Sequence, residues 1–234
     1  MCTQKMTNKR SLIIPAYNEE RRIGTVVAKY AAFFPNQEII VVCDGCIDNT
    51  VNIVKRLCSR YPWVKCLEFR QKLGKGGAIA EGFRVAEGSA IGFVDADESV
   101  KPDDVARMFD ALPDNDGVIA SRRLKDSRIL VKQPLKRRLA SRTFNWIVRV
   151  MFGLPFRDTQ CGAKVFTRKA IKDVLPELNT KGFEFDVELL WRLKNKGYKV
   201  IEFPITWKHS GGSTFSLSQA PGMFYSLLKV RLWT

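Results

Sequence analysis

The stretch Ala90-Ile91-Gly92-Phe93-Val94-Asp95-Ala96-Asp97 joins an apolar run to two carboxylates at positions i and i+2. The apolar run is typical of a buried strand. A strand that ends in this way brings acidic groups to the carboxyl edge of a sheet, where open α/β folds bind their ligands. Because two neighbouring carboxylates repel each other unless a cation lies beside them, the pair indicates a Mg²⁺ or Mn²⁺ site. A loop start or a helix cap would use the same Asp-x-Asp pattern, so the rest of the chain has to decide.

The chain around this stretch alternates between short apolar runs and segments with helical spacing of apolar residues. We expect strands at residues 11–15, 38–43, 64–69, 90–94 and 117–120, with helices at 22–34, 48–60, 76–87 and 102–112 between them. Such alternation predicts an α/β fold with a mainly parallel, doubly wound sheet flanked by helices. No repeat, linker or low-complexity segment divides the 234 residues, so we expect a single domain with functional halves at about 10–115 and 116–234.

The charge of the chain is strongly positive and unevenly distributed. There are 39 Lys and Arg against 24 Asp and Glu, a net charge of +15, which predicts an anionic partner. Residues 122–142 hold nine of the basic residues and one acid, Asp126, and run into an amphipathic stretch at 144–152. We expect no nucleic-acid partner, because the aromatic-basic interleaving typical of nucleic-acid-binding modules is missing. Anionic lipid and phosphorylated substrates remain as partners for this basic amphipathic segment, 122–152.

The six cysteines are scattered without a disulfide framework, and no secretory signal peptide precedes them, which indicates a reducing compartment. The Cys43-x-x-Cys46 pair has no second Cys pair or His cluster to complete a zinc site. No apolar run approaches the roughly 18 residues of a transmembrane helix. We therefore expect a soluble or peripheral protein.

Small and acidic residues also follow the other expected strands of the first half, in the segments 15–20, 44–50 and 73–78. Since parallel strands share one carboxyl edge, we expect all of them to meet Asp95. Each has an alternative role: Asp48 is a suitable helix cap, and the glycines of 74–77 suit a turn. The loop Gly74-Lys75-Gly76 lacks the full P-loop spacing, but it offers backbone N–H groups and a cation to a diphosphate.

Taken together, these segments resemble a known family. Pro15-Ala16-Tyr17-Asn18-Glu19-Glu20, Asp44-Gly45, Gly74-Lys75-Gly76 and Asp95-Ala96-Asp97 resemble the inverting nucleotide-sugar glycosyltransferases of family 2, which have the Rossmann-like GT-A fold. In the second half, the strings at 157–164 and 183–190, with Trp207 and Gly212-Ser213, resemble the dolichyl-phosphate sugar synthases. The string Asp158-Thr159-Gln160-Cys161-Gly162 is more similar to the glucosyltransferase branch than to the mannose branch. The resemblance covers about residues 10–217.

The resemblance implies a donor site and a metal site at the sheet edge. Residues expected to contact the uracil and ribose are Ala16, Tyr17, Glu19 and Asp44, with Lys75 and Gly76 beside the nucleotide. Asp95 would hold ribose or sugar hydroxyls, and Asp97 would bind the metal that bridges the diphosphate. The relatives often have Gln or another polar residue two positions after Asp97. This chain has Ser99 there, with Glu98 as the alternative ligand.

The resemblance also implies an acceptor site. Arg137 and Ser141, four positions apart on one helix face, match the family's grip on an acceptor phosphate, with Arg142 beside them. Arg122 would face a donor or acceptor phosphate and joins Asp95 and Asp97 as a catalytic residue. Residues expected to shape the sugar pocket are Asp158, Gln160, Asp186 and Glu188. As an alternative, one of these carboxylates pairs with Arg157 or Lys164. His209, the only histidine, is expected at the surface or behind the ligands.

The function implied is transfer of a hexose, with glucose from UDP-glucose as first choice, to dolichyl or polyprenyl phosphate with inversion. A lipid-phosphate oxygen is already anionic and needs no general base, while the metal and cations stabilise the leaving diphosphate. The alternatives are GDP-mannose as donor, or a glycan acceptor and a catalytic base. We expect a peripheral enzyme at the cytoplasmic face of a membrane, on an anionic membrane surface. The sequence leaves open whether a membrane-spanning partner supplies transmembrane helices. Trp146, Val150 and Phe152 suit either the membrane interface or the core.

Overall fold

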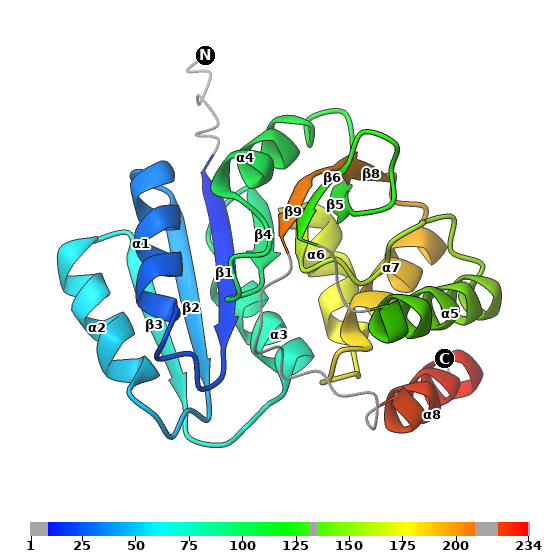
Figure 1. The fold of residues 1–234 in the computed structure, drawn as a ribbon, viewed down its shortest axis with the longest axis horizontal. Helices are drawn as coiled ribbons and strands as arrows, with labels where there is room; N and C mark the ends of the chain where they lie inside the picture. Colours follow the sequence, from blue (N-terminus) through cyan, green and yellow to red (C-terminus); the bar gives the residue numbers. More distant parts are fainter. Residues whose placement is uncertain (1–8, 132–134, 209–219, 234) are drawn as a thin grey trace, which may run out of the picture.

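The computed structural model describes residues 9–131, 135–208 and 220–233, with only the backbone described for residues 135–140, 220, 221 and 233. Its centre is a seven-stranded sheet of order β3-β2-β1-β4-β7-β5-β8 (Figure 1). Every neighbouring pair is parallel except those of β7, which runs antiparallel to β4 and β5. The predicted mainly parallel sheet is therefore confirmed. Its strands are β1 (Arg10–Ala16), β2 (Glu38–Asp44), β3 (Val64–Phe69), β4 (Ala90–Val94), β5 (Gly117–Ser121), β7 (Ala163–Thr167) and β8 (Val200–Pro204).

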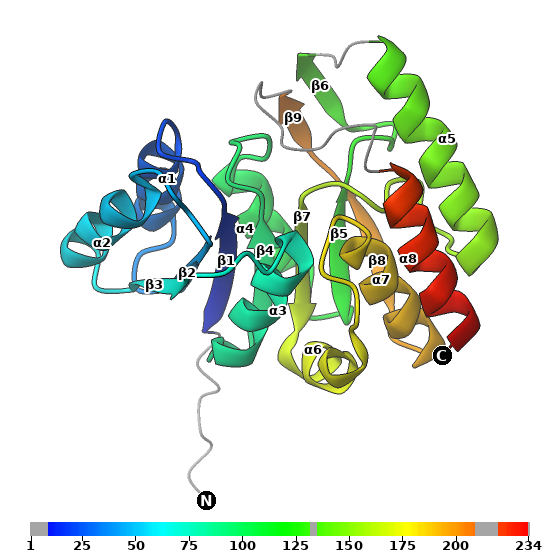
Figure 2. The same ribbon diagram turned by 90° about the horizontal axis from the view of Figure 1, so that it is seen from below.

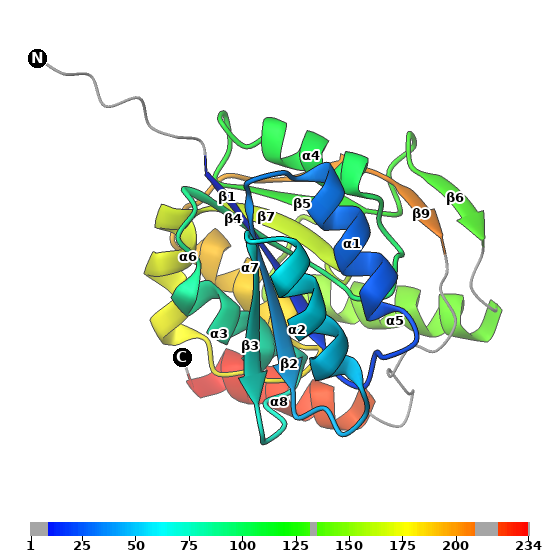
Figure 3. The same ribbon diagram turned by 90° about the vertical axis from the view of Figure 1, so that its left-hand side faces the viewer.

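Helices cover both faces of the sheet (Figures 2 and 3). One core lies beneath α1 (Ile23–Phe33), α2 (Thr50–Arg60) and α4 (Pro102–Asp110). The other core lies beneath α3 (Lys75–Val85), α5 (Leu135–Phe152), α6 (Arg168–Val174), α7 (Phe185–Asn195) and α8 (Ala220–Trp233). Side chains of β1 alternate between the two cores: Leu12 and Ile14 face the first, and Ile13 faces the second. A short 3₁₀ helix, η1 (Leu175–Glu177), follows α6.

A second, two-stranded parallel sheet was not predicted from the sequence. It pairs β6 (Arg128–Val131) with β9 (Thr206–Lys208). β9 also holds the loop that follows the Asp-x-Asp pair, because Val100 forms an isolated bridge with Trp207 and the Lys208 amide donates to the Ser99 carbonyl at 3.2 Å. The second half of the chain thus folds back onto the first beside Asp97.

The amphipathic end of α5 divides between core and surface. Phe152 is buried and its ring lies 5.5 Å from that of Trp191, whereas Trp146 and Val150 are exposed. His209, Gly212 and Ser213 lie outside the described residues, and so does the side chain of Arg137. Among the described helices, none has the length and apolar character needed to cross a membrane.

Candidate active site

The carboxyl ends of β1, β2 and β4 meet at a cavity of about 340 Å³. The structure brings seven of the predicted residues to its wall: Ala16, Tyr17, Glu19, Asp44, Lys75, Asp95 and Asp97. It adds lining residues that the sequence analysis missed: Arg22, Lys72, Phe183, Glu184 and Met223. Phe183 and Glu184 precede α7, and Met223 lies in the first turn of α8, so the wall opposite the sheet comes from the second half of the chain.

Asp95 is fixed by a cation and by a glycine. Its Oδ1 lies 2.7 Å from Lys75 Nζ, and its amide donates to the Gly162 carbonyl at 2.9 Å. A Cβ at Gly162 would lie 1.9 Å from Asp95 Oδ2, so only glycine leaves room for this carboxylate. Burial raises the pKa of Asp95, the positive charge of Lys75 opposes that shift, and the negative charge of Asp97 adds to it.

Replacing Gly162 with alanine is therefore expected to displace the Asp95 carboxylate and to lower activity by tenfold or more, because misplacement by about 1 Å costs up to about 100-fold. Gly24→Ala on α1 is the matched control, since its added Cβ meets one side-chain methyl at 3.3 Å. Steady-state rates of the two variants, with thermal melts to confirm folding, check this expectation. Equal activity of the two would contradict it.

Lys75 belongs to a buried chain of alternating charges. Its Nζ lies 3.7 Å from one oxygen of Asp186, whose other oxygen lies 2.6 Å from Lys164 Nζ. Burial disfavours the charge on Lys75, but the carboxylates of Asp95 and Asp186 outweigh it and hold its pKa above the usual value. The expectation that one inward carboxylate pairs with Lys164 is confirmed for Asp186, which lies behind Lys75 and not on the cavity wall.

Asp97 is the carboxylate that fits a metal. It lines the cavity, and its Oδ1 accepts from the Ser99 amide at 2.9 Å. Glu98 does not line the cavity and instead forms an ion pair with Lys29 at 2.9 Å; Ser99 is buried and also absent from the wall. Within the described parts of the chain, no group of three His, Cys, Asp or Glu is arranged to hold a metal. Since Mg²⁺ is commonly held by one or two carboxylates together with substrate phosphates, Asp97 fits a site completed by a diphosphate.

The glycine loop is held by the protein itself. Asp44 accepts from the amides of Leu73 and Gly74, at 2.5 and 3.0 Å. The amides of Gly76 and Gly77 donate to the Lys181 carbonyl, at 2.8 and 3.3 Å. Within the predicted loop, the amides of Gly74 and Gly76 therefore donate to the protein itself. A Cβ at Gly76 would lie 2.5 Å from Phe185 Cβ, so this glycine serves close packing.

Two further basic residues, Arg22 and Lys72, line the cavity at the carboxyl end of β1. Glu19 forms an ion pair with Arg22, and the same arginine is close enough to Asp97 for that carboxylate to contribute, after Glu19, to raising its pKa. Lys72 Nζ lies 3.4 Å from the centre of the Tyr17 ring. With Lys75, these residues give the cavity three basic groups. The i, i+3 spacing of Glu19 and Arg22 is a sequence signal that would have identified the arginine.

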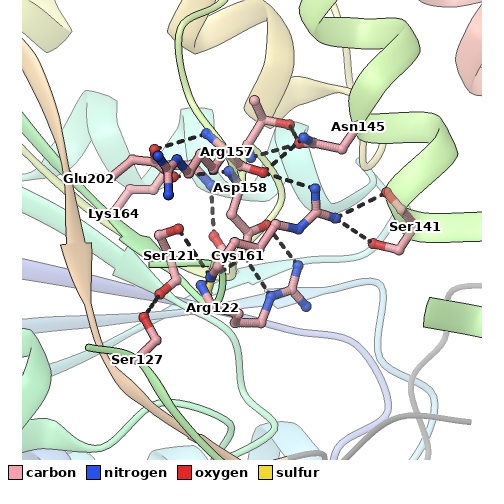
Figure 4. Close-up of polar contacts among 12 residues, drawn as sticks. Ser121, Arg122, Ser127, Ser141, Asn145, Arg157, Asp158, Cys161, Lys164 and Glu202 are labelled. Atoms are coloured by element: carbon pink, nitrogen blue, oxygen red, sulfur yellow. Dashed lines mark hydrogen bonds and ion pairs between the residues drawn. The ribbon is translucent and has the colours of Figure 1, made fainter. Parts of the chain in front are cut away.

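Arg122 does not line the cavity and is paired with Asp158 (Figure 4). Its Nε and Nη2 donate to the two carboxylate oxygens at 2.7 and 2.9 Å, and its amide adds a contact at 3.0 Å. Burial alone would raise the pKa of Asp158, but Arg122 lowers it to about 2. The guanidinium also lies 5.4 Å from the centre of the Trp207 ring. Arg122 and Asp158 thus bind each other, and neither of them lines the cavity.

The same loop anchors α5 (Figure 4). Asn145 donates to the Arg157 carbonyl at 2.9 Å and accepts from the Thr159 amide at 3.1 Å. Arg123 Nη2 donates to the carbonyl and the hydroxyl of Ser141, at 3.2 and 3.4 Å. Arg142 is exposed, and neither Ser141 nor Arg142 reaches the cavity wall.

Two of the expected sugar-pocket residues also lie off the wall. Glu188 is fully buried and accepts from Thr180, through its amide at 2.8 Å and its hydroxyl at 2.7 Å, and from Arg192 Nη2 at 3.0 Å. It therefore ties α7 to the preceding loop. Gln160 is half-buried and does not line the cavity.

Comparison with known proteins agrees with this architecture. The family model "Glycosyl transferase family 2" matches residues 11–175. The dolichyl-phosphate beta-glucosyltransferase of Saccharomyces cerevisiae is 31% identical over 231 residues, which cover 89% of this chain and 69% of that protein. The protein of the same name from Drosophila melanogaster is 32% identical over 221 residues, covering 87% of this chain and 68% of that protein.

Among solved structures, glucosyl-3-phosphoglycerate synthase from Mycobacterium tuberculosis, in complex with Mn²⁺, uridine diphosphate and phosphoglyceric acid, superposes with a TM-score of 0.73. The match covers 97% of this chain and 79% of that one at 16% identity, which shows the shared GT-A fold alone. The family match and the close relatives establish more than the fold: the chain belongs to glycosyl transferase family 2 and is a glycosyltransferase.

Proposed function

We propose that the enzyme transfers a hexose, with UDP-glucose as the donor, to the phosphate of dolichyl or another polyprenyl phosphate, with inversion at the anomeric carbon. The observation that carries this proposal is the similarity to dolichyl-phosphate beta-glucosyltransferases over 89% of the chain. The cavity supports it, because its lining combines Asp97, which fits a divalent metal, with three basic groups suited to an anionic donor: Arg22, Lys72 and Lys75.

The donor's diphosphate would lie between Asp97 and the cations Arg22 and Lys75. Mg²⁺ or Mn²⁺ bound at Asp97 would supply positive charge to the leaving diphosphate. Asp95, held in place by Lys75 and Gly162, would accept hydrogen bonds from ribose or sugar hydroxyls. Ala16 and Tyr17 on the same wall would contact the base and ribose.

The acceptor phosphate is already ionised near neutral pH, so its oxygen attacks the anomeric carbon without a dedicated base. Arg137, Ser141 and Arg142 on the first half of α5 are proposed to hold this phosphate. Arg122 would act by fixing, through Asp158, the loop against which α5 packs. Gln160 is the proposed sugar contact from that loop.

We further propose that the enzyme works as a peripheral protein at the cytoplasmic face of a membrane. The net charge of +15 favours an anionic membrane surface. A membrane-spanning partner would then be an additional anchor rather than a part of the active site.

The experiment that tests this function is a transfer assay with Mg²⁺ or Mn²⁺, labelled UDP- and GDP-sugars and a short polyprenyl phosphate. The expected result is a chloroform-soluble labelled product from UDP-glucose. A product from GDP-mannose alone would instead identify a mannose synthase. If no donor gives an organic-phase product, the lipid acceptor is wrong.

A glycan acceptor is the second alternative, and Glu184 makes it testable. Its carboxylate is on the cavity wall, where it would serve as the base that a sugar hydroxyl requires. For a phosphate acceptor, Glu184→Gln is expected to change kcat by less than about tenfold. Loss of a hundredfold or more, by rate measurement with saturating substrates, would favour a hydroxyl acceptor.

A further inference from the structure

Three cysteines from separate segments of the chain meet behind the active-site cavity. Cys43 is the last residue but one of β2, Cys46 follows that strand, and Cys66 lies in β3. Cys43 is fully buried in the core beneath α1, α2 and α4, and the other two pack against that core. All three are free thiols. We define the thiol cluster as Cys43, Cys46 and Cys66.

The thiols of Cys43 and Cys66 are within reach of each other, since their Sγ atoms lie 3.9 Å apart. The register of β2 and β3 sets Cys66 opposite Val41, so both cysteines point to the same face of the sheet. The sulfur atoms of a disulfide are about 2 Å apart, so the two thiols must approach by roughly 2 Å to join. β3 is the edge strand of the seven-stranded sheet (Figure 3), which leaves it room for such a shift.

The two thiols differ in acidity. A hydrogen bond from Cys43 lowers the pKa of the Cys66 thiol, against the opposing effect of burial. Interactions with Cys46 and Cys66, together with burial, raise the pKa of the Cys43 thiol. Cys66 is half-buried and so open in part to a small oxidant, whereas Cys43 is enclosed. A partly exposed thiol of lowered pKa beside a second thiol is the arrangement from which a disulfide forms on oxidation.

The thiol cluster adjoins the wall of the cavity. Cys43 directly precedes Asp44, which lines the cavity and accepts from the amides of Leu73 and Gly74 at 2.5 and 3.0 Å. The thiol of Cys46 donates to the carbonyl of Ala16, another lining residue, at 3.3 Å. A shift of the carboxyl end of β2 would therefore reach the cavity through Asp44.

Metal binding does not account for the cluster. In the part of the chain that the structure describes, no group of three His, Cys, Asp or Glu is arranged to hold a metal ion. Cys46 is also engaged with the Ala16 carbonyl, which leaves Cys43 and Cys66 as the pair with a direct sulfur contact.

We propose that Cys43 and Cys66 form a disulfide when the enzyme meets hydrogen peroxide, and that this bond weakens the donor site by displacing Asp44. The pull of the new bond on the end of β2 would withdraw the Asp44 carboxylate from the amides of Leu73 and Gly74. The bond itself forms without any donor or acceptor substrate, so it does not depend on the proposed function.

The chemistry balances in two steps. The Cys66 thiolate attacks one oxygen of the peroxide, the O–O bond breaks, and the hydroxide that leaves takes up a proton to become water. The Cys43 thiol then attacks the sulfur of the resulting sulfenic acid, and its proton leaves with the hydroxyl group as a second water. Two thiols thus lose two electrons in all, and one peroxide is reduced to two waters.

Mass spectrometry of the full chain, treated with hydrogen peroxide and digested without reductant, tests the bond. Wild type is expected to give a peptide pair that links Cys43 to Cys66, and dithiothreitol should remove it. Cys66→Ser and Cys66→Ala should lack it, with thermal melts to confirm folding. Cys58→Ser, which replaces a half-buried thiol on α2, is the matched control and should keep it. No linked pair, or a link from Cys43 to Cys46 in its place, overturns the proposal.

Hydrogen exchange over residues 70–75 tests the effect on the donor wall. Oxidised wild type is expected to exchange these amides about tenfold faster than reduced wild type, because a hydrogen bond to a carboxylate is lost. Oxidised Cys66→Ser should exchange them at the reduced rate. Unchanged exchange in wild type that carries the disulfide would overturn the link to Asp44.

Transfer activity below saturation with UDP-glucose tests the consequence for the enzyme. Oxidised wild type is expected to lose about tenfold in rate and to regain it with dithiothreitol, whereas peroxide-treated Cys66→Ser should stay within about twofold of its untreated rate. A loss that Cys66→Ser shares, or that dithiothreitol does not reverse, would overturn the control of activity by this pair. A disulfide and faster exchange in an enzyme that transfers to no acceptor would reject the proposed function and support the thiol pair.

Discussion

Replacing Asp97 with asparagine is expected to lower kcat by about a hundredfold or more, because it weakens the divalent metal that would supply positive charge to the leaving diphosphate, and a preorganised charge of that kind contributes on that scale. The amide keeps the size of the side chain and an oxygen that can accept from the Ser99 amide, now 2.9 Å from the carboxylate. Folding should therefore be unaffected while the negative charge on the cavity wall is lost. Steady-state rates and thermal melts measure the two effects separately.

Asp103→Asn is the matched control, since this carboxylate lies on α4 with its side chain 68% exposed. It should retain wild-type activity. Chelation of divalent metal should bring wild type down to the rate of Asp97→Asn and leave that variant nearly unchanged. If Asp97→Asn keeps most of its activity, the proposed metal ligand is wrong.

Replacing Arg122 with methionine is expected to destabilise the fold by about 3–5 kcal/mol, because it leaves the Asp158 carboxylate buried without its cation. Lysine should rescue the loss only in part, since it cannot donate to both oxygens at once. Urea denaturation measures the change in unfolding free energy. Arg84→Met, which breaks an exposed ion pair with Glu81, is the control and should cost at most about 1 kcal/mol.

The Arg122–Asp158 pair also predicts how stability depends on pH. The pKa of Asp158 is about 2 in the folded protein, below the usual value of about 3.9 in an unfolded chain. Its ionised form therefore favours folding. The contribution of about 2–3 kcal/mol is complete above roughly pH 4 and is lost as the pH falls toward about 2. Arg122→Met should lack this loss in acid denaturation measurements, and an identical acid profile for the two proteins would contradict the assignment.

Most of the sheet was predictable because its strands are short, apolar and bounded by turn residues. All seven residues of β2 are buried, which is why Glu38–Asp44 has an uninterrupted apolar run before its terminal acid. The small sheet of β6 and β9 was not predictable. Arg128–Val131 carries few residues and much exposed surface, and its partner Thr206–Lys208 lies more than seventy residues away.

The position of a site residue could be predicted where the residue lies at the carboxyl end of a predicted strand. Ala16, Asp44, Asp95 and Asp97 all reach the cavity wall for this reason. The hydrogen-bond or ion-pair partner of each polar group could not be predicted from the sequence. The Lys181 carbonyl accepts hydrogen bonds from the amides of Gly76 and Gly77, and Asp158 forms an ion pair with Arg122. In both cases the partner comes from a segment far along the chain.

The same limit applies to the outer wall of the cavity. In the sequence, Phe183 and Met223 look like ordinary apolar residues. Only the packing of α7 and α8 brings them to the cavity that Asp97 also lines. Their place on the wall depends on tertiary contacts that periodicity does not encode.

Direct transfer of glucose to the lipid phosphate is tested most directly by the anomeric configuration of the lipid-linked product. This product is formed from UDP-glucose and a short polyprenyl phosphate, and its configuration is determined by proton NMR. UDP-glucose carries glucose in the α configuration. Direct attack by the lipid phosphate predicts a single organic-soluble product with glucose in the β configuration. A product with glucose in the α configuration, or glucose released to water with no lipid-linked product, would contradict the account.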